Sequence, residues 1–305
     1  MRSSRALGIV LAFGTACVSG VSIYLNGRAV HHFHNATVFT TAKNAVAGAL
    51  LVALALAWKS RAPRRESLRE PLRPRQWLAL LGVAVIGGSV PFALFFEGLA
   101  RAQATQAAFI QKTLVIWVAL LAVPLLRERF RAPHALAICL LVAGQAWLVG
   151  SAGKVVFGEG EAMILGATLL WSVEVVYVKR LLTSLPPGTL AAARMGGGTV
   201  LLLAWIAATG KLGQLGGYGL EQWRWVAVSG LLLSAYVATW YAALALAQAI
   251  DVTAVLVFGA VITALLSGAA DGAHVSVPGT VLVAAGAALV AATALRRPAG
   301  REAPA

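Results

Sequence analysis

Five ionisable side chains interrupt long apolar runs of this sequence, and their chemistry needs an explanation first. Placing a charged side chain in hydrocarbon costs about 2.5–3.5 kcal/mol on insertion scales, so each group needs a partner, a water-lined cavity or a route to the interface. Their depths along the runs predict two ion pairs, one on each side of the midplane, with snorkelling as the alternative. The expected pairs are Lys43 with Glu97 and Glu174 with Arg194, and the fifth residue is Lys112.

Lys112 is the deepest of these charges, near the middle of an apolar run over residues 104–126. It is too far from either end of this run for easy snorkelling. We expect Lys112, with Gln111 beside it, to face a central cavity and to attract a carboxylate or another anionic group of a substrate. A buried lysine can also take part in proton exchange. A structural pair between Lys112 and Glu97 is the alternative.

Aromatic side chains form a second candidate group. Two pairs are spaced by one helical turn, and two further tryptophans lie inside apolar runs. Their rings predict a cavity wall suited to amphipathic or aromatic solutes, with helix packing or lipid contact as the alternative. The residues are Phe92 with Phe96, Tyr236 with Trp240, Trp117 and Trp171.

Metal, redox and hydrolytic chemistry are not indicated. His31, His32 and His34 cluster in one loop, but their spacing fits no standard zinc pattern. Cys17 and Cys139 lie in the middle of apolar runs, where we expect buried packing residues and no disulfide. The sequence has no H-E-x-x-H motif, no paired intramembrane aspartates and no G-x-x-x-x-G-K-[ST] motif. We therefore expect neither an enzyme, nor a cofactor, nor direct use of ATP.

The elements that must position these residues are membrane-spanning helices. Of 305 residues, 59% are hydrophobic and 12% charged, and the mean hydropathy is +0.81, which excludes an ordinary soluble enzyme. Runs of this length cross about 30 Å of hydrocarbon as helices, and their continuous Leu, Ala and Val content disfavours a β-barrel. The sequence predicts an all-α polytopic protein with ten spans near 6–25, 38–58, 76–99, 104–126, 133–150, 160–178, 189–209, 222–246, 250–270 and 276–295.

The positive charge of the chain indicates orientation. A formal net charge of +14 would suit a nucleic-acid partner if the basic residues formed a patch. Instead, seventeen of the 25 lie in segments on one side of the predicted spans, above all in the loop over residues 59–76. This asymmetry follows the positive-inside rule. We expect both termini in the cytoplasm, the cytoplasmic (inner) membrane as the location, anionic lipid headgroups as partners of the basic loops, and no nucleic acid.

An internal repeat organises the ten spans. Residues 99–104 match residues 244–249 in five of six positions, and the same offset of 145 aligns the following helix without a gap. Each half then contains five spans, so the second half enters the membrane from the other side. The sequence predicts inverted repeats over 1–153 and 154–305 within one membrane domain, with a substrate site near the midplane between them.

The sequence resembles the drug/metabolite transporter superfamily, and within it the EamA type. The resemblance covers nearly the whole chain and is carried by Phe-Phe-Glu-Gly-Leu-Ala at 95–100, Leu-Leu-Arg-Glu-Arg-Phe at 125–130 and Leu-Leu-Val-Ala-Gly at 140–144. The matching positions include Glu128 at the end of helix four, Gly144 and Gly286, a basic residue in helices two and seven at Lys43 and Arg194, and Trp171. Many members have a proline in the middle of helices four and nine, whereas helix four carries Gln111 and Lys112 here.

The resemblance implies a secondary transporter that exports small organic metabolites, such as amino acids or amphipathic compounds, by alternating access. Proton coupling through Glu97, Lys112 or Glu174 is allowed, and so are uniport and exchange. Other interpretations are an exchanger for phosphorylated or nucleotide-linked sugars, which needs several basic residues in its cavity, and a passive channel or scaffold. A homodimer is left open.

Overall fold

The computed structural model describes residues 2–61, 73–151, 157–272 and 274–296. Most of the basic loop over 59–76 and the expected boundary between the halves at residue 153 lie outside the described residues. Within them the fold is all-helical and the ten predicted spans are present, nine of them long and apolar enough to cross a membrane, with a shorter apolar helix, Ala132–Leu148, as the fifth. The fold class predicted from the sequence is therefore confirmed.

The first half contains spans one to five. Several spans extend beyond the predicted apolar run because helices continue into the polar region that borders the hydrocarbon. The elements are α1 (Arg2–Ala29), η1 (Val30–His32), α2 (Ala36–Arg61), α3 (Pro74–Val83), η2 (Ala84–Ser89), α4 (Val90–Leu99), α5 (Ala104–Lys112), α6 (Leu114–Leu126) and α7 (Ala132–Ser151).

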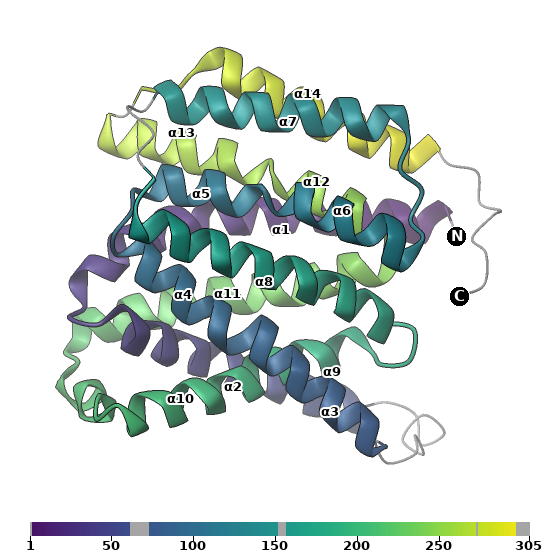
Figure 1. Ribbon diagram of the computed structural model, residues 1–305. Helices are drawn as coiled ribbons and strands as arrows, with labels where there is room; N and C mark the ends of the chain where they lie inside the picture. The colour runs from purple at the N-terminus through teal and green to yellow at the C-terminus, as the bar shows by residue number, and fades with distance from the viewer. Residues whose placement is uncertain (1, 62–72, 152–156, 273, 297–305) are drawn as a thin grey trace.

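The second half repeats this order. Figure 1 shows α7 and α14 side by side at one edge of the bundle and α2 and α10 at the other, with the remaining spans between them. The elements are α8 (Glu159–Leu181), α9 (Pro187–Ala192), η3 (Ala193–Gly197), α10 (Gly198–Ala208), η4 (Leu212–Gly217), α11 (Leu220–Leu246), α12 (Ala249–Leu256), α13 (Gly259–Asp271) and α14 (Val277–Arg296).

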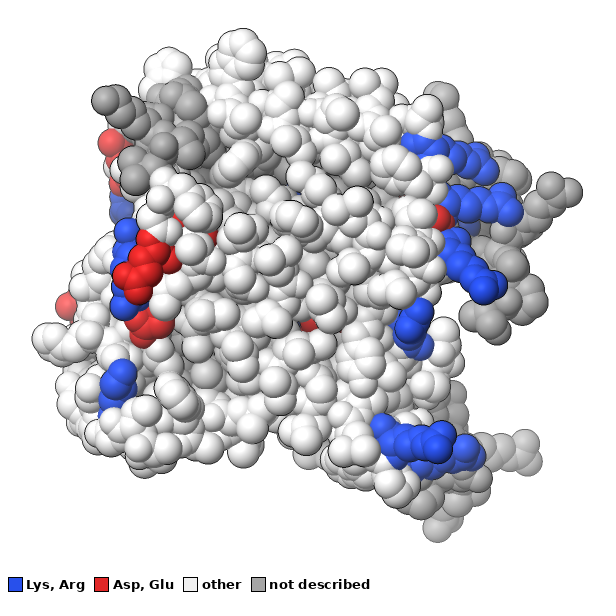
Figure 2. Space-filling model, viewed as in Figure 1, with Lys and Arg blue, Asp and Glu red and all other residues white. Residues whose placement is uncertain are grey.

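The two ends of the bundle differ in charge. Lys and Arg side chains gather at the end where α1 begins and α14 ends, which we call the basic end, whereas Asp and Glu lie together with other Lys and Arg side chains at the opposite end (Figures 1 and 2). The basic end carries the loop with Arg127, Arg129 and Arg131, and the opposite end carries Glu159 and Asp271. This arrangement gives the bundle the charge asymmetry that orients membrane proteins.

Glycine pairs hold the two halves together. Lipid tails are as apolar as leucine, so helices in a membrane associate through close packing, and small residues allow it. At four places a Cβ on either glycine would meet the partner glycine's own backbone, which shows direct backbone contact between the halves. The pairs are Gly20 with Gly259, Gly88 with Gly198, Gly98 with Gly160, and Gly144 with Gly279.

Both cysteines correct an expectation. Cys17 and Cys139 were expected to be buried, but each is an exposed free thiol on the surface of the bundle. In a membrane protein the face toward lipid is as apolar as the core, so hydropathy locates a residue along a helix but does not tell which way it points.

Filling one glycine contact tests this packing. The carbonyl oxygen of Gly279 and Cγ2 of Val283 would both lie 2.8 Å from a Cβ at Gly144. We expect Gly144→Leu to lower the melting temperature, since overpacking a core costs about 1–3 kcal/mol. Gly14→Leu is the matched control, because nothing lies within 4 Å of a Cβ there. Equal melting temperatures for the two variants, measured in detergent, would contradict the close α7–α14 contact.

Candidate functional site

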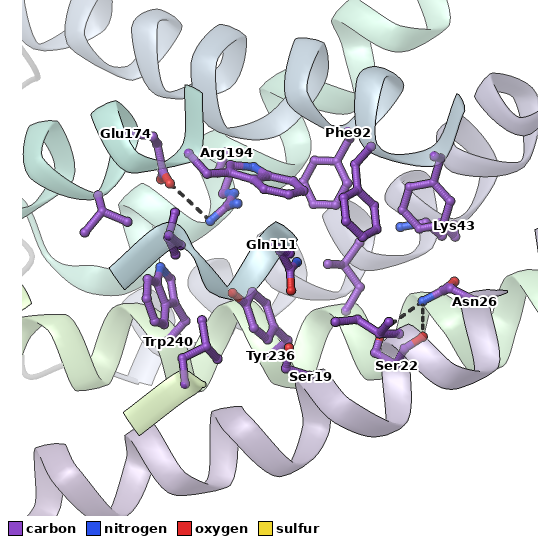
Figure 3. A pocket seen from close by; sticks show the side chains of 18 residues that line it. Ser19, Ser22, Asn26, Lys43, Phe92, Gln111, Glu174, Arg194, Tyr236 and Trp240 are labelled. Carbon is purple, nitrogen blue, oxygen red and sulfur yellow. Dashed lines mark hydrogen bonds and ion pairs between the residues drawn. The ribbon is translucent and has the colours of Figure 1, made fainter. Parts of the chain in front are cut away.

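A central cavity of about 60 Å³ lies between the two halves (Figure 3). Each half contributes four of its helical spans to the wall. The first half supplies Ser19, Ser22, Ile23, Asn26, Lys43, Phe92, Phe95, Phe96, Gln111 and Leu114, and the second supplies Trp171, Glu174, Val175, Arg194, Leu233, Tyr236, Trp240 and Leu256. Since a water needs roughly 10–15 Å³ of such space, the cavity has room for several waters or a small solute.

Two π-helical segments shape one wall of this cavity. Both η2 and η3 interrupt the regular i to i−4 hydrogen bonding of their spans, and Gly88 of η2 packs against the backbone of Arg194 in η3 and of Gly198 at the start of α10. The carbonyl oxygen of Gly87 accepts hydrogen bonds from Trp171 Nε1 and Arg194 Nε, both at 3.1 Å. π-helical turns are frequent at functional sites because they free backbone groups in this way.

An ion pair occupies one end of the cavity, as the sequence led us to expect. Arg194 Nη1 lies 3.5 Å from Glu174 Oε2, and both side chains are almost fully buried. The hydroxyl of Tyr241 donates a hydrogen bond of 2.5 Å to the other carboxylate oxygen of Glu174. With the Arg194 bond to Gly87, each charge therefore has a charged partner and a further polar contact, which is what buried ions require.

Lys43 lies at the other end of the cavity, and the expected pair with Glu97 is wrong. Its Nζ donates a hydrogen bond to Asn44 Oδ1 at 3.2 Å and lies 4.0 Å from the ring centre of Phe96 and 4.9 Å from that of Phe92. None of the ion pairs between described residues includes Lys43.

Glu97 instead accepts hydrogen bonds from the hydroxyl and the backbone N–H of Thr37 and forms an ion pair of 2.8 Å with Arg101. Glu97 and Arg101 are four residues apart at the end of α4, so this neighbour is within reach, and Glu97 lies outside the cavity wall.

Lys112 is buried behind the wall of the central cavity, which corrects the expectation that it faces the cavity. Its Nζ donates to Ser19 Oγ at 2.8 Å and to Gln111 Oε1 at 3.0 Å. Ser19 and Gln111 line the central cavity, whereas Lys112 itself does not. The alternative pair with Glu97 is not formed either. Lys112 borders a smaller cavity of about 10 Å³ between α5, α6 and α7, together with Gln145 and Val257.

Spans four and nine break at equivalent positions although neither has a central proline. The first break is at Thr113, between α5 and α6, and the second is at Val257 and Phe258, between α12 and α13. Phe258 follows Thr113 by the repeat offset of 145 residues. Tighter i to i−3 hydrogen bonds close both turns, and the Val257 carbonyl accepts both the Ala260 N–H at 3.0 Å and the Gln145 amide at 3.4 Å. Discontinuous helices of this kind border the substrate sites of many transporters.

Most of the expected aromatic residues line the cavity. Phe92, Phe96, Trp171, Tyr236 and Trp240 do so, with Tyr236 stacked on Trp240 at a ring separation of 6.0 Å and Phe92 edge-on to Trp171 at 5.3 Å. Trp117 does not, since its Nε1 donates to Thr113 Oγ1 within the same helix.

The sequence prediction missed a polar stripe on α1. Ser19, Ser22 and Asn26 line the cavity, and the Asn26 amide donates to the Ser22 hydroxyl and carbonyl oxygens. Asn26 Oδ1 has no hydrogen-bond partner, so it remains an acceptor for a solute or water. Spacings of three and four residues place these side chains on one helix face, and this signal was present in the sequence.

Contacts between the halves close the basic end of the bundle. Arg127 adopts a left-handed conformation with φ of 53° at the end of α6, and the next residue, Glu128, accepts hydrogen bonds from the backbone N–H groups of Ala249 and Ile250 at the start of α12. Burial raises the pKa of the Glu128 carboxyl above its usual value, although these two bonds act in the opposite direction. Arg180 also crosses between the halves, to the Leu125 carbonyl.

A second buried contact joins the halves at the same end, where His134 Nε2 lies 3.4 Å from Asp251 Oδ1. Neither residue was singled out from the sequence, because both stand near predicted span ends, where charges are common.

Surface contacts also join the two halves at the opposite end. Arg28, at the end of α1, pairs with Asp271, at the end of α13. His32 Nδ1 lies 3.2 Å from Glu221 Oε1, and its ring stacks on Trp225, which gives one member of the histidine cluster a packing role. Both contacts join the first half to the second, so the central cavity lies between two sets of cross-half contacts.

Comparisons with known proteins agree with this architecture. A solved structure titled "Crystal structure of protein" shares the fold, with a TM-score of 0.73 and 18% sequence identity over 96% of this chain and 99% of that chain. No match is found among curated proteins. Residues 6–150 and 158–292 each match the EamA-like transporter family. The chain therefore belongs to the EamA-like transporter family and is a multi-pass membrane transporter of the drug/metabolite type built from two inverted repeats.

Proposed function

We propose that the protein is a secondary transporter that exports small organic metabolites, such as amino acids or other amphipathic compounds, by alternating access. The observation that carries this proposal is the central cavity, which both halves line and which lies between two sets of cross-half contacts. A carrier needs a site of this kind, because the halves must close alternately on either side of the solute.

The same contacts favour a carrier over a passive channel. A channel needs a continuous polar path, whereas here Glu128 joins the halves at the basic end and the Arg28–Asp271 pair joins them at the other. An exchanger for phosphorylated sugars is also less well supported. Of the two basic side chains in the cavity wall, Arg194 is already paired with Glu174, which leaves one cation for a doubly charged phosphate.

The proposed orientation places the basic end in the cytoplasm, together with both termini. The gathering of Lys and Arg at this end supports the assignment, and anionic lipid headgroups are its natural partners (Figure 2). Export then means loading from the basic end and release at the opposite end.

Counterflow in proteoliposomes tests whether the protein is a carrier. Vesicles containing the purified protein are preloaded with one metabolite at a time from an amino-acid and organic-acid panel, and uptake of the labelled compound is followed. We expect preloading to accelerate uptake for at least one compound, because exchange avoids the return of the empty carrier. Uptake that is fast but indifferent to preloading for every compound transported would support a channel instead.

Removing the Glu128 contact tests the closure at the basic end. Glu128→Ala deletes acceptors for two backbone N–H groups, so we expect a loss of about 1–2 kcal/mol of stability and slower counterflow, because the state closed at this end is weakened. Glu161→Ala is the control, since Glu161 caps α8 within one half by accepting from the Gly158 N–H. The control should lose stability without slowing counterflow. Wild-type counterflow in the Glu128 variant would contradict the proposed closure.

A further inference from the structure

We propose that Lys43 forms the anion-binding subsite of the central cavity and that the transported solutes are small monocarboxylates with an apolar or aromatic body. This inference rests on the proposed function and names its substrate class. Attraction of an anionic group of the substrate, which the sequence predicted for Lys112, is then the role of Lys43.

The first support is the environment of Lys43. Lys43 is 1% exposed and borders the cavity, yet within the part of the chain that the structure describes its one hydrogen bond goes to the neutral Asn44 amide. Two aromatic rings stabilise its charge in part, with Phe96 the closer at 4.0 Å. Burying an ion without a charged partner destabilises the protein, and a counterion of good geometry offsets this cost. A carboxylate in the cavity would supply this counterion.

The second support is a comparison between the two halves. Lys43 lies seven residues after Ala36, the first residue of α2, and Arg194 lies seven residues after Pro187, the first residue of α9. Spans two and seven are equivalent in the repeat, so the two basic residues occupy equivalent positions, and both lie near the Phe92 ring. Arg194 has Glu174 as its partner. No acid among the described residues pairs with Lys43, which leaves the place of a carboxylate open in the first half.

The third support is the charge of the cavity wall. Three residues of the wall carry a carboxylate, an ammonium or a guanidinium group, namely Lys43, Glu174 and Arg194. The charges of Glu174 and Arg194 neutralise each other. One positive charge remains, which matches a monoanion and not a phosphate dianion. Figure 3 shows Lys43 at the end of the cavity away from the Glu174–Arg194 pair, with Phe92 between them.

The rest of the wall fits an apolar body. Trp171, Tyr236 and Trp240 line the cavity, and the last two stack their rings on each other. Flat rings favour planar or aromatic groups through stacked and edge-on contacts. A solute whose carboxylate meets Lys43 would therefore place its body against these aromatic side chains.

Lys112 does not compete for this role. Its ammonium already has two oxygen partners, Ser19 Oγ and Gln111 Oε1, and it lies outside the wall of the cavity. It supports the wall by orienting both of these side chains.

The test compares three probes of equal length and different charge on the purified full-length protein. These are 3-phenylpropionate, its neutral amide 3-phenylpropanamide, and the cation 3-phenylpropylamine, with affinities taken from concentration-dependent thermal shifts at neutral pH. A charge-assisted hydrogen bond to Lys43 should make the carboxylate bind at least about ten-fold more tightly than the amide, and the amine should bind most weakly. Equal affinity of carboxylate and amide, or no binding by any probe, would overturn the proposal.

Two variants assign the preference to this lysine. Lys43→Met should bring the carboxylate and the amide to within about two-fold of each other. The same substitution at a surface loop, Lys211→Met, should keep the wild-type preference. A preference that survives in the Lys43 variant would contradict the assignment. Because the charge series on the wild-type protein needs no variant, the proposal stays testable if Lys43→Met fails to fold.

Counterflow separates this inference from the proposed function. If the protein shows counterflow with some solute but 3-phenylpropionate neither binds nor competes, the carrier proposal stands and the monocarboxylate subsite is wrong. If 3-phenylpropionate binds through Lys43 but no solute shows counterflow, the subsite stands and the carrier proposal is wrong.

Discussion

The hydrocarbon core of the membrane imposes the constraint on which this structure depends. It offers no water to a polar group, so every charge and every freed backbone carbonyl must find its partner inside the protein. The environment of Arg194 follows from this rule. Its guanidinium pairs with the Glu174 carboxylate and donates to the Gly87 carbonyl, for which Pro91, four residues on, offers no N–H. At the break in span nine, the Val257 carbonyl likewise has two donors, the Ala260 N–H and the Gln145 amide. Some buried side-chain atoms of the described residues have no hydrogen-bond partner, and two of them, Asn26 Oδ1 and Arg194 Nη1, belong to residues that line the cavity.

The two halves differ in whether their buried basic residue has an acidic partner, and this difference sets the charge of the cavity. Repetition places a basic residue at equivalent positions of spans two and seven, and it breaks spans four and nine at equivalent residues, Thr113 and Phe258. The repeated backbone therefore builds a symmetrical frame around the midplane. The side chains then depart from symmetry, because the acid that neutralises Arg194 has no counterpart at Lys43. A symmetrical backbone suits a carrier whose two ends open and close in turn. A positive charge at one end of the cavity suits a solute that binds in one orientation.

The sequence predicted well those features that depend on position along a helix. Ten spans, the inverted repeat and the depths of the five charges follow from hydropathy and spacing, and the Glu174–Arg194 pair follows from matching depths. Features that depend on the direction around a helix were not predictable in this way. Lys112 points behind the cavity wall while its neighbour Gln111 lines it, and Cys17 faces outward. Since a membrane helix is apolar on its lipid face as well as its packed face, its sequence carries little information about rotation. Some partners were nevertheless within reach of the sequence, such as Arg101, four residues after Glu97.

The central claim is that the two halves move against each other around the cavity, and distances between spin labels test it most directly. In a variant with Cys17→Ser and Cys139→Ser, one label pair joins positions 129 and 184 at the basic end, and a second joins positions 103 and 214 at the opposite end. Pulsed electron paramagnetic resonance then gives both distance distributions in lipid, with and without a solute that supports counterflow. The account predicts that the solute shifts the two distributions in opposite directions, so that one end widens as the other narrows. Distributions that stay unchanged at both ends, in a protein that still shows counterflow, would contradict it.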